Sequence, residues 1–352
     1  MKPLLRPEIL DLAEYHLVQY PHTIKLNQNE NPYELPMDIK REILERLASA
    51  HWSRYPSFIP QEQIDLVARH AGWVPDGTLL GNGSNDLLQL LFMAVLERGK
   101  SVVISQPTFT LYKLLARGLG ADVREVPMLK GFEFDVRGII DAARQSDAAM
   151  VVLCSPNNPT GTLLGEADVV SVIESTTGVV VLDEAYVHFA PGSLRHLLAT
   201  YDRLVILQTF SKAMGAAGLR FGYALAAPSF ARQLNKLKLP YNVNIFTLLG
   251  AEVLIRRWEM IKGWIAVIVQ ERERMREALS GMKGLVPYRS SANFHLVELT
   301  GNTPGDVFRR LADRGILVRD VSSYPQLSRC LRITIGTPEE NSALLTALQE
   351  VL

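Results

Sequence analysis

The sequence predicts an α/β protein with a mostly parallel sheet flanked by helices, followed by a smaller α+β domain at its C-terminal end. Short β-branched runs alternate with amphipathic helical stretches over most of the chain, as in βαβ units. These runs place apolar residues on both faces of the strand, so we expect helices to cover both faces of the sheet. The length of 352 residues is enough for about two domains.

We expect the elements in the following order. Residues 1–30 are rich in Asn, Pro and Tyr and form an arm with a short helix at 7–16. Residues 31–250 form the large domain, with its clearest strands at 101–105, 148–153, 178–183 and 203–208, and with helices at 86–97 and 166–174. A long helical region and short strands in NFHLVEL, GILVRD and CLRITIG form a small domain at 251–352.

Composition and charge exclude several classes of protein. The chain has 37 Lys and Arg against 37 Asp and Glu and no basic block, which argues against binding nucleic acid or an anionic membrane surface. Two cysteines and the histidine spacing give neither a disulfide framework nor a metal site, and they indicate a reducing compartment. No apolar run approaches the ~18 residues that span a bilayer. We therefore expect a cytoplasmic protein without a bound metal.

Polar segments follow three consecutive predicted strands. They are SPNNPTG at 155–161, DEAY at 183–186 and TFSKAMGAAGLRFGY at 209–223. Ligands of open parallel sheets bind beyond the carboxyl ends of the strands. The three segments are therefore expected to form one site.

Two residues of these segments suggest a chemistry. Lys212 lies among small residues directly after a buried strand, where a low pKa would free its amine to form a Schiff base with an aldehyde, although a single Lys is more often solvated. Asp183 ends an apolar run and must be paired there. A protonated pyridine nitrogen would satisfy Asp183, whereas the alternative is that it caps the following turn.

Three further features fit a flat, phosphorylated cofactor. In GNGSND, at 81–86, two glycines precede a helix with Ser84 or Asn85 as its N-cap, an arrangement that binds phosphate. The loop lacks the lysine of a Walker A motif and carries Asp86 where a dinucleotide fingerprint has its third glycine. Phe109 is either a stacking ring or a core residue. Asn157 is either a turn residue or a donor to a phenolate oxygen.

Taken together, these motifs resemble the histidinol-phosphate aminotransferase family, which belongs to the fold-type I pyridoxal-phosphate-dependent transferases. The resemblance covers nearly the whole chain and is carried by RPEILDLAEYH, LNQNENPY, RYP, GNGSND, SQPTFTLY, SPNNPTG, DEAY, TFSKAMGAAGLRFGY, GILVRD and LRITIGTPEEN. Two departures stand out: the phosphate loop reads GSND where members often have GSDE, and Phe109 stands where many have Tyr.

The resemblance implies a role for each matching residue. Lys212 would hold pyridoxal 5'-phosphate covalently and move the proton between substrate and cofactor. Asp183 would pair with the ring nitrogen, while Asn157 and Tyr186 would bond the 3' oxygen. Phe109 would stack on the ring. The phosphate would be bound by Gly83, Ser84, Asn85, Thr209, Ser211 and Arg220. Tyr55 would come from a second subunit, which makes the protein a homodimer.

The substrates implied by the resemblance are L-histidinol phosphate and 2-oxoglutarate, in histidine biosynthesis. One cationic pocket must then accept a phosphate and a carboxylate, and the planar fork of arginine can bind both. Arg332 and Arg319 would form this pocket, and Tyr20 and Asn29 of the arm would complete it.

Other functions remain open at this point. A threonine-phosphate decarboxylase or an aromatic amino acid aminotransferase of the same fold would use similar residues. A non-enzymatic module that binds pyridoxal phosphate usually adds a DNA-binding domain, for which the chain has no spare length. A nicotinamide dehydrogenase is disfavoured because GNGSND lacks the fingerprint.

Overall fold

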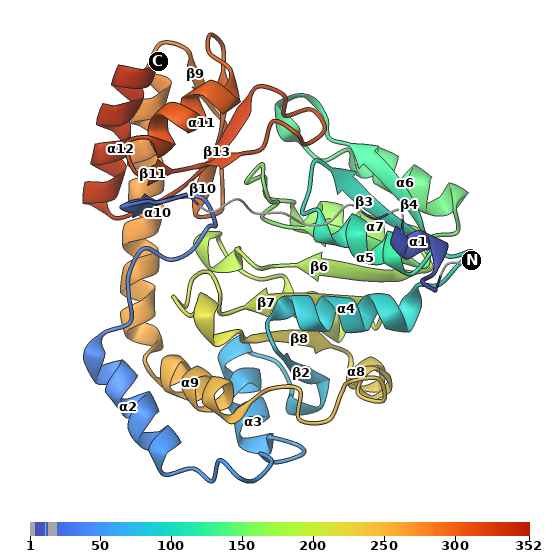
Figure 1. Cartoon of the computed structure of the whole chain (residues 1–352). Helices are drawn as coiled ribbons and strands as arrows, with labels where there is room; N and C mark the ends of the chain where they lie inside the picture. Colours follow the sequence, from blue (N-terminus) through green and yellow to red (C-terminus); the bar gives the residue numbers. More distant parts are fainter. Residues whose placement is uncertain (1–3, 11, 13–19) are drawn as a thin grey trace.

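The computed structural model describes residues 4–10, 12 and 20–352, and its centre is a seven-stranded sheet (Figure 1). The strand order is β2 (Thr78–Gly81), β8 (Gly222–Ala226), β7 (Leu204–Thr209), β6 (Val179–Asp183), β5 (Met150–Cys154), β3 (Ser101–Gln106) and β4 (Asp122–Pro127). Strands β7, β6, β5, β3 and β4 pair in parallel, and β8 runs antiparallel to both of its neighbours. The predicted fold class is therefore confirmed.

The four strands predicted most clearly are β3, β5, β6 and β7, and nearly all their residues are buried. Successive side chains of a strand point to opposite faces, and both faces are covered. The helices on one face include α4 (Ser84–Val95), α5 (Leu111–Gly118) and α8 (Pro228–Leu234). The other face is covered by α3 (Gln61–Ala71), α6 (Val136–Gln145), α7 (Glu166–Ser175) and α9 (Ile245–Arg256). Burial on both faces explains why these strands carry apolar residues on both faces.

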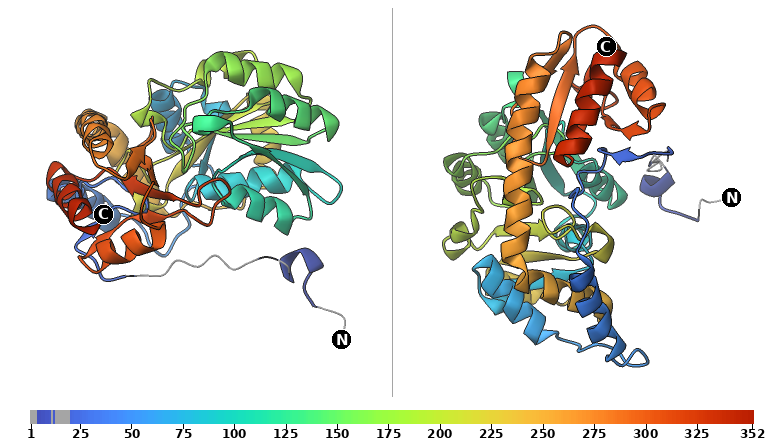
Figure 2. Two further views of the ribbon diagram at one scale, coloured as in Figure 1. Left: turned by 90° about the horizontal axis from the view of Figure 1, so that it is seen from above. Right: turned by 90° about the vertical axis from the view of Figure 1, so that its left-hand side faces the viewer.

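A smaller antiparallel sheet lies beside the parallel one. Its strand order is β12 (Arg319–Asp320), β13 (Cys330–Thr334), β10 (Phe294–Leu299) and β9 (Leu285–Pro287). Helices α11 (Pro304–Ala312) and α12 (Pro338–Val351) pack against this small sheet. The long helix α10 (Trp258–Ser280), orange in Figure 2, runs along one side of the molecule from α9 to this sheet. Strand β1 (Ile24–Lys25) of the arm pairs in parallel with β11 (Ile316–Leu317), so the arm crosses the small sheet's region before α2 (Met37–Ala48).

Some expected boundaries differ in the structure. The helix expected at 7–16 is α1 (Pro7–Leu10), and residues 11 and 13–16 lie outside the described part. The GILVRD segment forms two short strands, β11 and β12. The division at residues 30 and 250 stays a prediction; residue 250 lies inside α9, which packs against α2 and α3. Among the described residues, no helix has the length and apolar character needed to cross a membrane.

Candidate active site

A cavity of about 310 Å³ lies where β5, β6 and β7 end, between the two sheets. Twelve of the residues expected in the site line it: Asn29, Ser84, Asn85, Phe109, Asp183, Tyr186, Thr209, Ser211, Lys212, Arg220, Arg319 and Arg332. Segments more than 300 residues apart in the sequence, such as Asn29 and Arg332, therefore share one wall. The prediction that the three strand ends converge is correct in its geometry.

Lys212 follows β7, and its side chain is directed into this cavity. Its Nζ donates to the carbonyl oxygen of Gln28 at 2.8 Å and lies 5.8 Å from the centre of the Tyr186 ring. Burial, with a smaller contribution from the positive charge of Arg332, lowers the pKa of Lys212 from 10.5 to about 7. A substantial fraction of the amine is consequently neutral and nucleophilic near neutral pH.

Asp183 is the last residue of β6, and its carboxylate is buried. Its Oδ2 accepts from the hydroxyl of Tyr112 at 2.7 Å, and its Oδ1 accepts from the backbone N–H of Ala185 at 3.0 Å. Burial raises the pKa of Asp183, and these two hydrogen bonds oppose the rise. Within the described residues Asp183 forms no ion pair, so a protonated ring nitrogen in the cavity would supply the missing positive charge.

The start of α4 forms one end of the cavity. Gly83, with φ of 81°, occupies the N-cap position, and no side chain caps the helix. The expectation that Ser84 or Asn85 is the N-cap is wrong, because α4 already begins at Ser84. Asp86 instead accepts from the backbone N–H of Asn82 through its Oδ2 at 2.9 Å. Ser84 and Asn85 therefore line the cavity at a helix N-terminus, which favours an anion.

Two glycines let atoms of other segments approach closely at this end of the cavity. A Cβ on Gly83 would lie 2.6 Å from Nη2 of Arg220, and one on Gly222 would lie 2.4 Å from the backbone N of Ser84. Arg220 also donates to Oγ of Ser211 at 3.0 Å. A guanidinium, a hydroxyl and a helix N-terminus thus lie together at this end of the cavity, and each of these groups can bind a phosphate.

The structure places Asn158, and not Asn157, in the cavity wall. Asn157 is fully buried behind the wall: its Oδ1 accepts from Thr108 at 2.7 Å, and its Nδ2 donates to the Pro107 carbonyl and to Oγ1 of Thr160 at 2.9 Å each. The expected position of Asn157 is therefore corrected to Asn158. Both asparagines stand in the same turn, and the sequence has no signal that distinguishes them.

Arg332 and Arg319 line the side of the cavity that the small sheet forms, with Arg319 paired with Arg332 in the register of β12 and β13. Tyr324, which the sequence analysis missed, also lines this side. Tyr20 does not line the cavity: its ring meets Phe308 edge to face, with centroids 5.3 Å apart, so its expected place is corrected.

Asn29 contacts Tyr186 within the site. Its Nδ2 donates to the Tyr186 hydroxyl at 3.0 Å, and its Oδ1 accepts from the hydroxyl of Thr334 at 3.0 Å. Burial raises the pKa of Tyr186 well above its usual value, so its hydroxyl stays protonated. The arm therefore links Tyr186, which follows β6 of the large sheet, to β13 of the small one.

Tyr55 lies away from its own chain's cavity and is 80% exposed. Its ring stacks on Tyr241 with centroids 4.5 Å apart, and Phe58 meets Tyr241 edge to face. An exposed aromatic group of this kind is typical of a surface that binds another protein.

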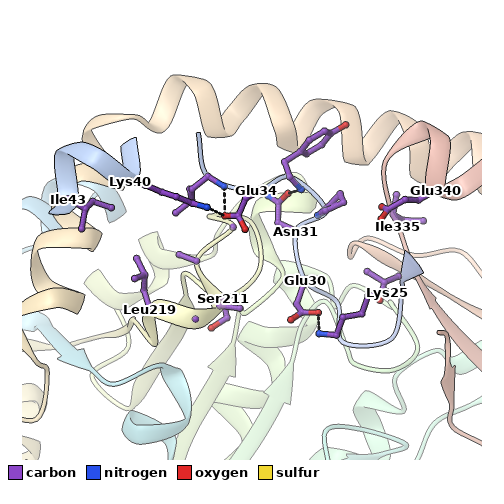
Figure 3. A pocket seen from close by; sticks show the side chains of 18 of the residues that line it. Lys25, Glu30, Asn31, Glu34, Lys40, Ile43, Ser211, Leu219, Ile335 and Glu340 are labelled. Carbon is purple, nitrogen blue, oxygen red and sulfur yellow. Dashed lines mark hydrogen bonds and ion pairs between the residues drawn. The ribbon is translucent and has the colours of Figure 1, made fainter. Parts of the chain in front are cut away.

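A second cavity, of about 610 Å³, adjoins the first (Figure 3). Glu30 and Ser211 line both cavities, and Glu30 forms an ion pair with Lys25. Ile43 and Leu219, both on the left in Figure 3, give this cavity an apolar wall. Its second lysine, Lys40, forms an ion pair with Glu34. In the described residues, no group of three or more His, Cys, Asp or Glu side chains could hold a metal ion.

The parallel sheet, the lysine after β7 and the carboxylate at the end of β6 define a fold-type I pyridoxal-phosphate-dependent transferase. Residues 21–348 match the family model described as aminotransferase class I and II. A histidinol-phosphate aminotransferase of Chlorobium luteolum is 38% identical over 94% of this chain and 92% of its own length. One of Chlorobaculum tepidum is 36% identical over 93% and 94% of the two chains. The chain belongs to the histidinol-phosphate aminotransferase family.

Solved structures agree with this assignment. The histidinol-phosphate aminotransferase of Sinorhizobium meliloti, in complex with pyridoxal-5'-phosphate, superposes with a TM-score of 0.88 at 27% identity, covering 99% of this chain and 97% of that one. An L-threonine-O-3-phosphate decarboxylase of Porphyromonas gingivalis shares the fold, with a TM-score of 0.81 over 93% and 99% of the chains, at 22% identity. The fold alone therefore does not select the reaction.

Proposed function

We propose that this chain is a pyridoxal-phosphate enzyme that transfers the amino group of L-histidinol phosphate to 2-oxoglutarate, giving imidazole acetol phosphate and L-glutamate in histidine biosynthesis. The observation that carries the proposal is that one cavity holds a lysine amine of low pKa, a buried carboxylate and two arginines. The relatives named for this reaction support the choice of substrate.

The residues present fit the cofactor. Bound pyridoxal phosphate supplies an electron sink for the bond cleaved at the amino-bearing carbon. Lys212 would hold it and would afterwards move the proton at that carbon, because its amine can be neutral or protonated near pH 7. The 3' oxygen would be bound by Tyr186 and, in place of Asn157, by Asn158.

The remaining contacts follow from the walls of the cavity. Asp183 would face the ring nitrogen and Phe109 a face of the ring. The phosphate would be held at the α4 end of the cavity by the backbone of Gly83, Ser84 and Asn85 and by the side chains of Thr209, Ser211 and Arg220. Gly83 supports this, because a residue without a side chain lets an anion approach the backbone closely.

Arg332 and Arg319 would bind the anionic group of each substrate in turn. The phosphate of histidinol phosphate and the α-carboxylate of glutamate both accept two hydrogen bonds from a guanidinium. Asn29 would contribute to the substrate pocket by donating a hydrogen bond to the hydroxyl of Tyr186. Tyr20 has no place in this proposal, because it packs on Phe308.

We further propose a homodimer in which Tyr55 reaches the partner's cavity. The exposure of Tyr55, Phe58 and Trp52 supports a protein interface on this face. A molecular mass in solution equal to one chain would contradict the dimer. The cytoplasmic location stays a prediction, to which the two free, buried cysteines add support.

The test is a substrate panel on purified protein. We expect amino transfer from histidinol phosphate that requires 2-oxoglutarate, with slower turnover of phenylalanine. Release of carbon dioxide from threonine phosphate without a keto acid would instead identify the decarboxylase. Lys212→Ala should abolish both the visible absorbance of the bound cofactor and turnover, whereas the matched control Lys236→Ala, at an exposed lysine, should retain both.

A further inference from the structure

Tyr112 is a completely buried tyrosine whose hydroxyl lies against the Asp183 carboxylate and the Cys154 thiol. It lies in the first turn of α5, three residues after Phe109, and the two rings meet edge to face with centroids 5.6 Å apart. Its hydroxyl donates to Oδ2 of Asp183 at 2.7 Å. One short segment thus supplies a ring that lines the cavity and a donor to the carboxylate of β6.

This hydroxyl can act only as a donor toward Asp183. Burial, followed by the negative charge of Asp183, raises the pKa of Tyr112 far above its usual value, so the proton stays on the phenol oxygen. With the Ala185 N–H on Oδ1, each carboxylate oxygen then has one fixed donor. The carboxylate is held in one orientation and keeps lone pairs for a partner in the cavity.

The other ionisable groups near Asp183 do not replace this contact. The Cys154 thiol is buried with its pKa raised to about 12, and the Tyr186 phenol also stays protonated. The Glu184 carboxyl has its pKa raised to about 6 by burial, and its oxygens accept from Ser193, Leu194 and Gln208. Of these three neighbours, Glu184 is the one that titrates in mildly acidic solution. Lys212, in the same cavity, has a pKa of about 7 and is present in each variant compared below, so its titration is common to all of them.

We propose that Tyr112 is a positioning residue that keeps Asp183 ionised and oriented, and that it thereby sets how tightly the site holds the protonated ring nitrogen of the cofactor. The inference rests on the proposed function, because it assumes that pyridoxal phosphate occupies the cavity. A hydrogen bond to a charged group is roughly twice as strong as a neutral one. Removing this donor therefore destabilises the ionised form of the Asp183 carboxyl more than its protonated form.

The experiment uses Tyr112→Phe, which keeps the ring and removes only the hydroxyl. Apoenzyme is titrated with pyridoxal phosphate, followed by absorbance, over a series of pH values. We expect the dissociation constant to rise about tenfold, in line with the loss of one charged hydrogen bond. Because the lost donor had lowered the pKa of Asp183, that pKa should be higher in the variant. As the solution is acidified, we therefore expect the variant to lose cofactor binding at a higher pH than the wild type.

Tyr223→Phe is the matched control. Tyr223 is equally buried, but its hydroxyl donates to the neutral amide oxygen of Gln208, which belongs to the network around Glu184. We expect this variant to leave the acid limit of cofactor binding in place. If Tyr223→Phe moves that limit and Tyr112→Phe does not, Glu184 governs it and the inference is overturned.

A double variant separates positioning from packing. Because Tyr112 acts through Asp183, Tyr112→Phe should have no further effect on cofactor affinity in an Asp183→Asn background. Equal losses in both backgrounds would assign the effect to packing and overturn the inference. Wild-type apoenzyme that fails to bind pyridoxal phosphate would overturn the proposed function as well, whereas wild-type binding with an unchanged Tyr112→Phe variant would overturn only the role of Tyr112.

Discussion

Nη1 of Arg332 donates to Oδ1 of Asn158 at 2.6 Å and so joins the small antiparallel sheet to the loop that follows β5. Nη2 of the same guanidinium donates to the carbonyl oxygen of Asn27 in the arm at 2.7 Å. Arg332 is therefore held by contacts from two distant segments before any substrate binds. Binding an anion there costs less side-chain entropy than ordering a free arginine would.

The two adjacent asparagines should respond differently to substitution. Asn157→Ala leaves the Thr108 hydroxyl and the Pro107 carbonyl, both buried, without their hydrogen-bond partner. We therefore expect the free energy of unfolding to fall by about 1–3 kcal/mol. Asn158→Ala should leave the unfolding free energy nearly unchanged but raise KM for the substrates about tenfold, because Arg332 loses its support. Urea unfolding and steady-state kinetics measure the two effects. The reverse pattern would contradict the placement of Asn158 in the wall.

The pH dependence of Lys212 follows from its pKa of about 7. Only the neutral amine attacks an aldehyde, so the rate at which apoenzyme captures a small uncharged aldehyde at Lys212 should rise with pH and level off above about 7, whereas an ordinary lysine continues to gain reactivity toward 10.5. Reductive trapping and mass spectrometry of the labelled peptide measure this rate. Since the charge of Arg332 helps to lower the pKa of Lys212, Arg332→Gln should move the midpoint to higher pH.

An unshifted midpoint in Arg332→Gln would contradict the electrostatic contribution of that residue. Arg309→Gln is the control, because Arg309 is exposed and pairs with Asp306 on α11. It should leave the midpoint where the wild type has it.

Gly222→Ala should weaken cofactor binding. The new Cβ would lie 2.4 Å from the backbone N of Ser84 and 2.7 Å from the carbonyl carbon of Gly83, so the start of α4 must shift. Overpacking of this kind costs about 1–3 kcal/mol, and we expect the dissociation constant of pyridoxal phosphate to rise about tenfold. Gly263→Ala is the control: it has open space in α10 and should raise the free energy of unfolding by about 0.5–1 kcal/mol. Unchanged cofactor affinity in Gly222→Ala would contradict a phosphate at this helix end.

Arg332→Gln should also raise KM for both anionic substrates. Loss of a charged hydrogen-bond donor costs about 1.5–3 kcal/mol, or roughly 10- to 100-fold in KM. The fold-increase should be similar for histidinol phosphate and for glutamate, because one guanidinium is proposed to serve both. Kinetics with each amino donor check this, using Arg309→Gln as the unaffected variant. A loss confined to one substrate would mean that the two anions bind at different residues.

The sequence by itself determined the class of fold, the four central strands and the presence of Lys212 and Asp183 at strand ends. These follow from local patterns: apolar β-branched runs specify buried strands, and the polar residue that ends each run must lie at the edge of the sheet. Gly83, directly before α4, is also a local signal, since its positive φ favours glycine.

Only the tertiary structure decided which of two adjacent asparagines faces the cavity, that Gly83 rather than Ser84 caps α4, that Tyr20 packs on Phe308, and that Tyr112 reaches Asp183. All but the cap of α4 depend on a contact between segments distant in the chain, such as Thr108 with Asn157 or Tyr112 with Asp183. Local sequence sets the conformations that a turn or an arm can adopt. The hydrogen bonds that a buried group must satisfy select one of them, and the partners become known only when the sheets are packed together.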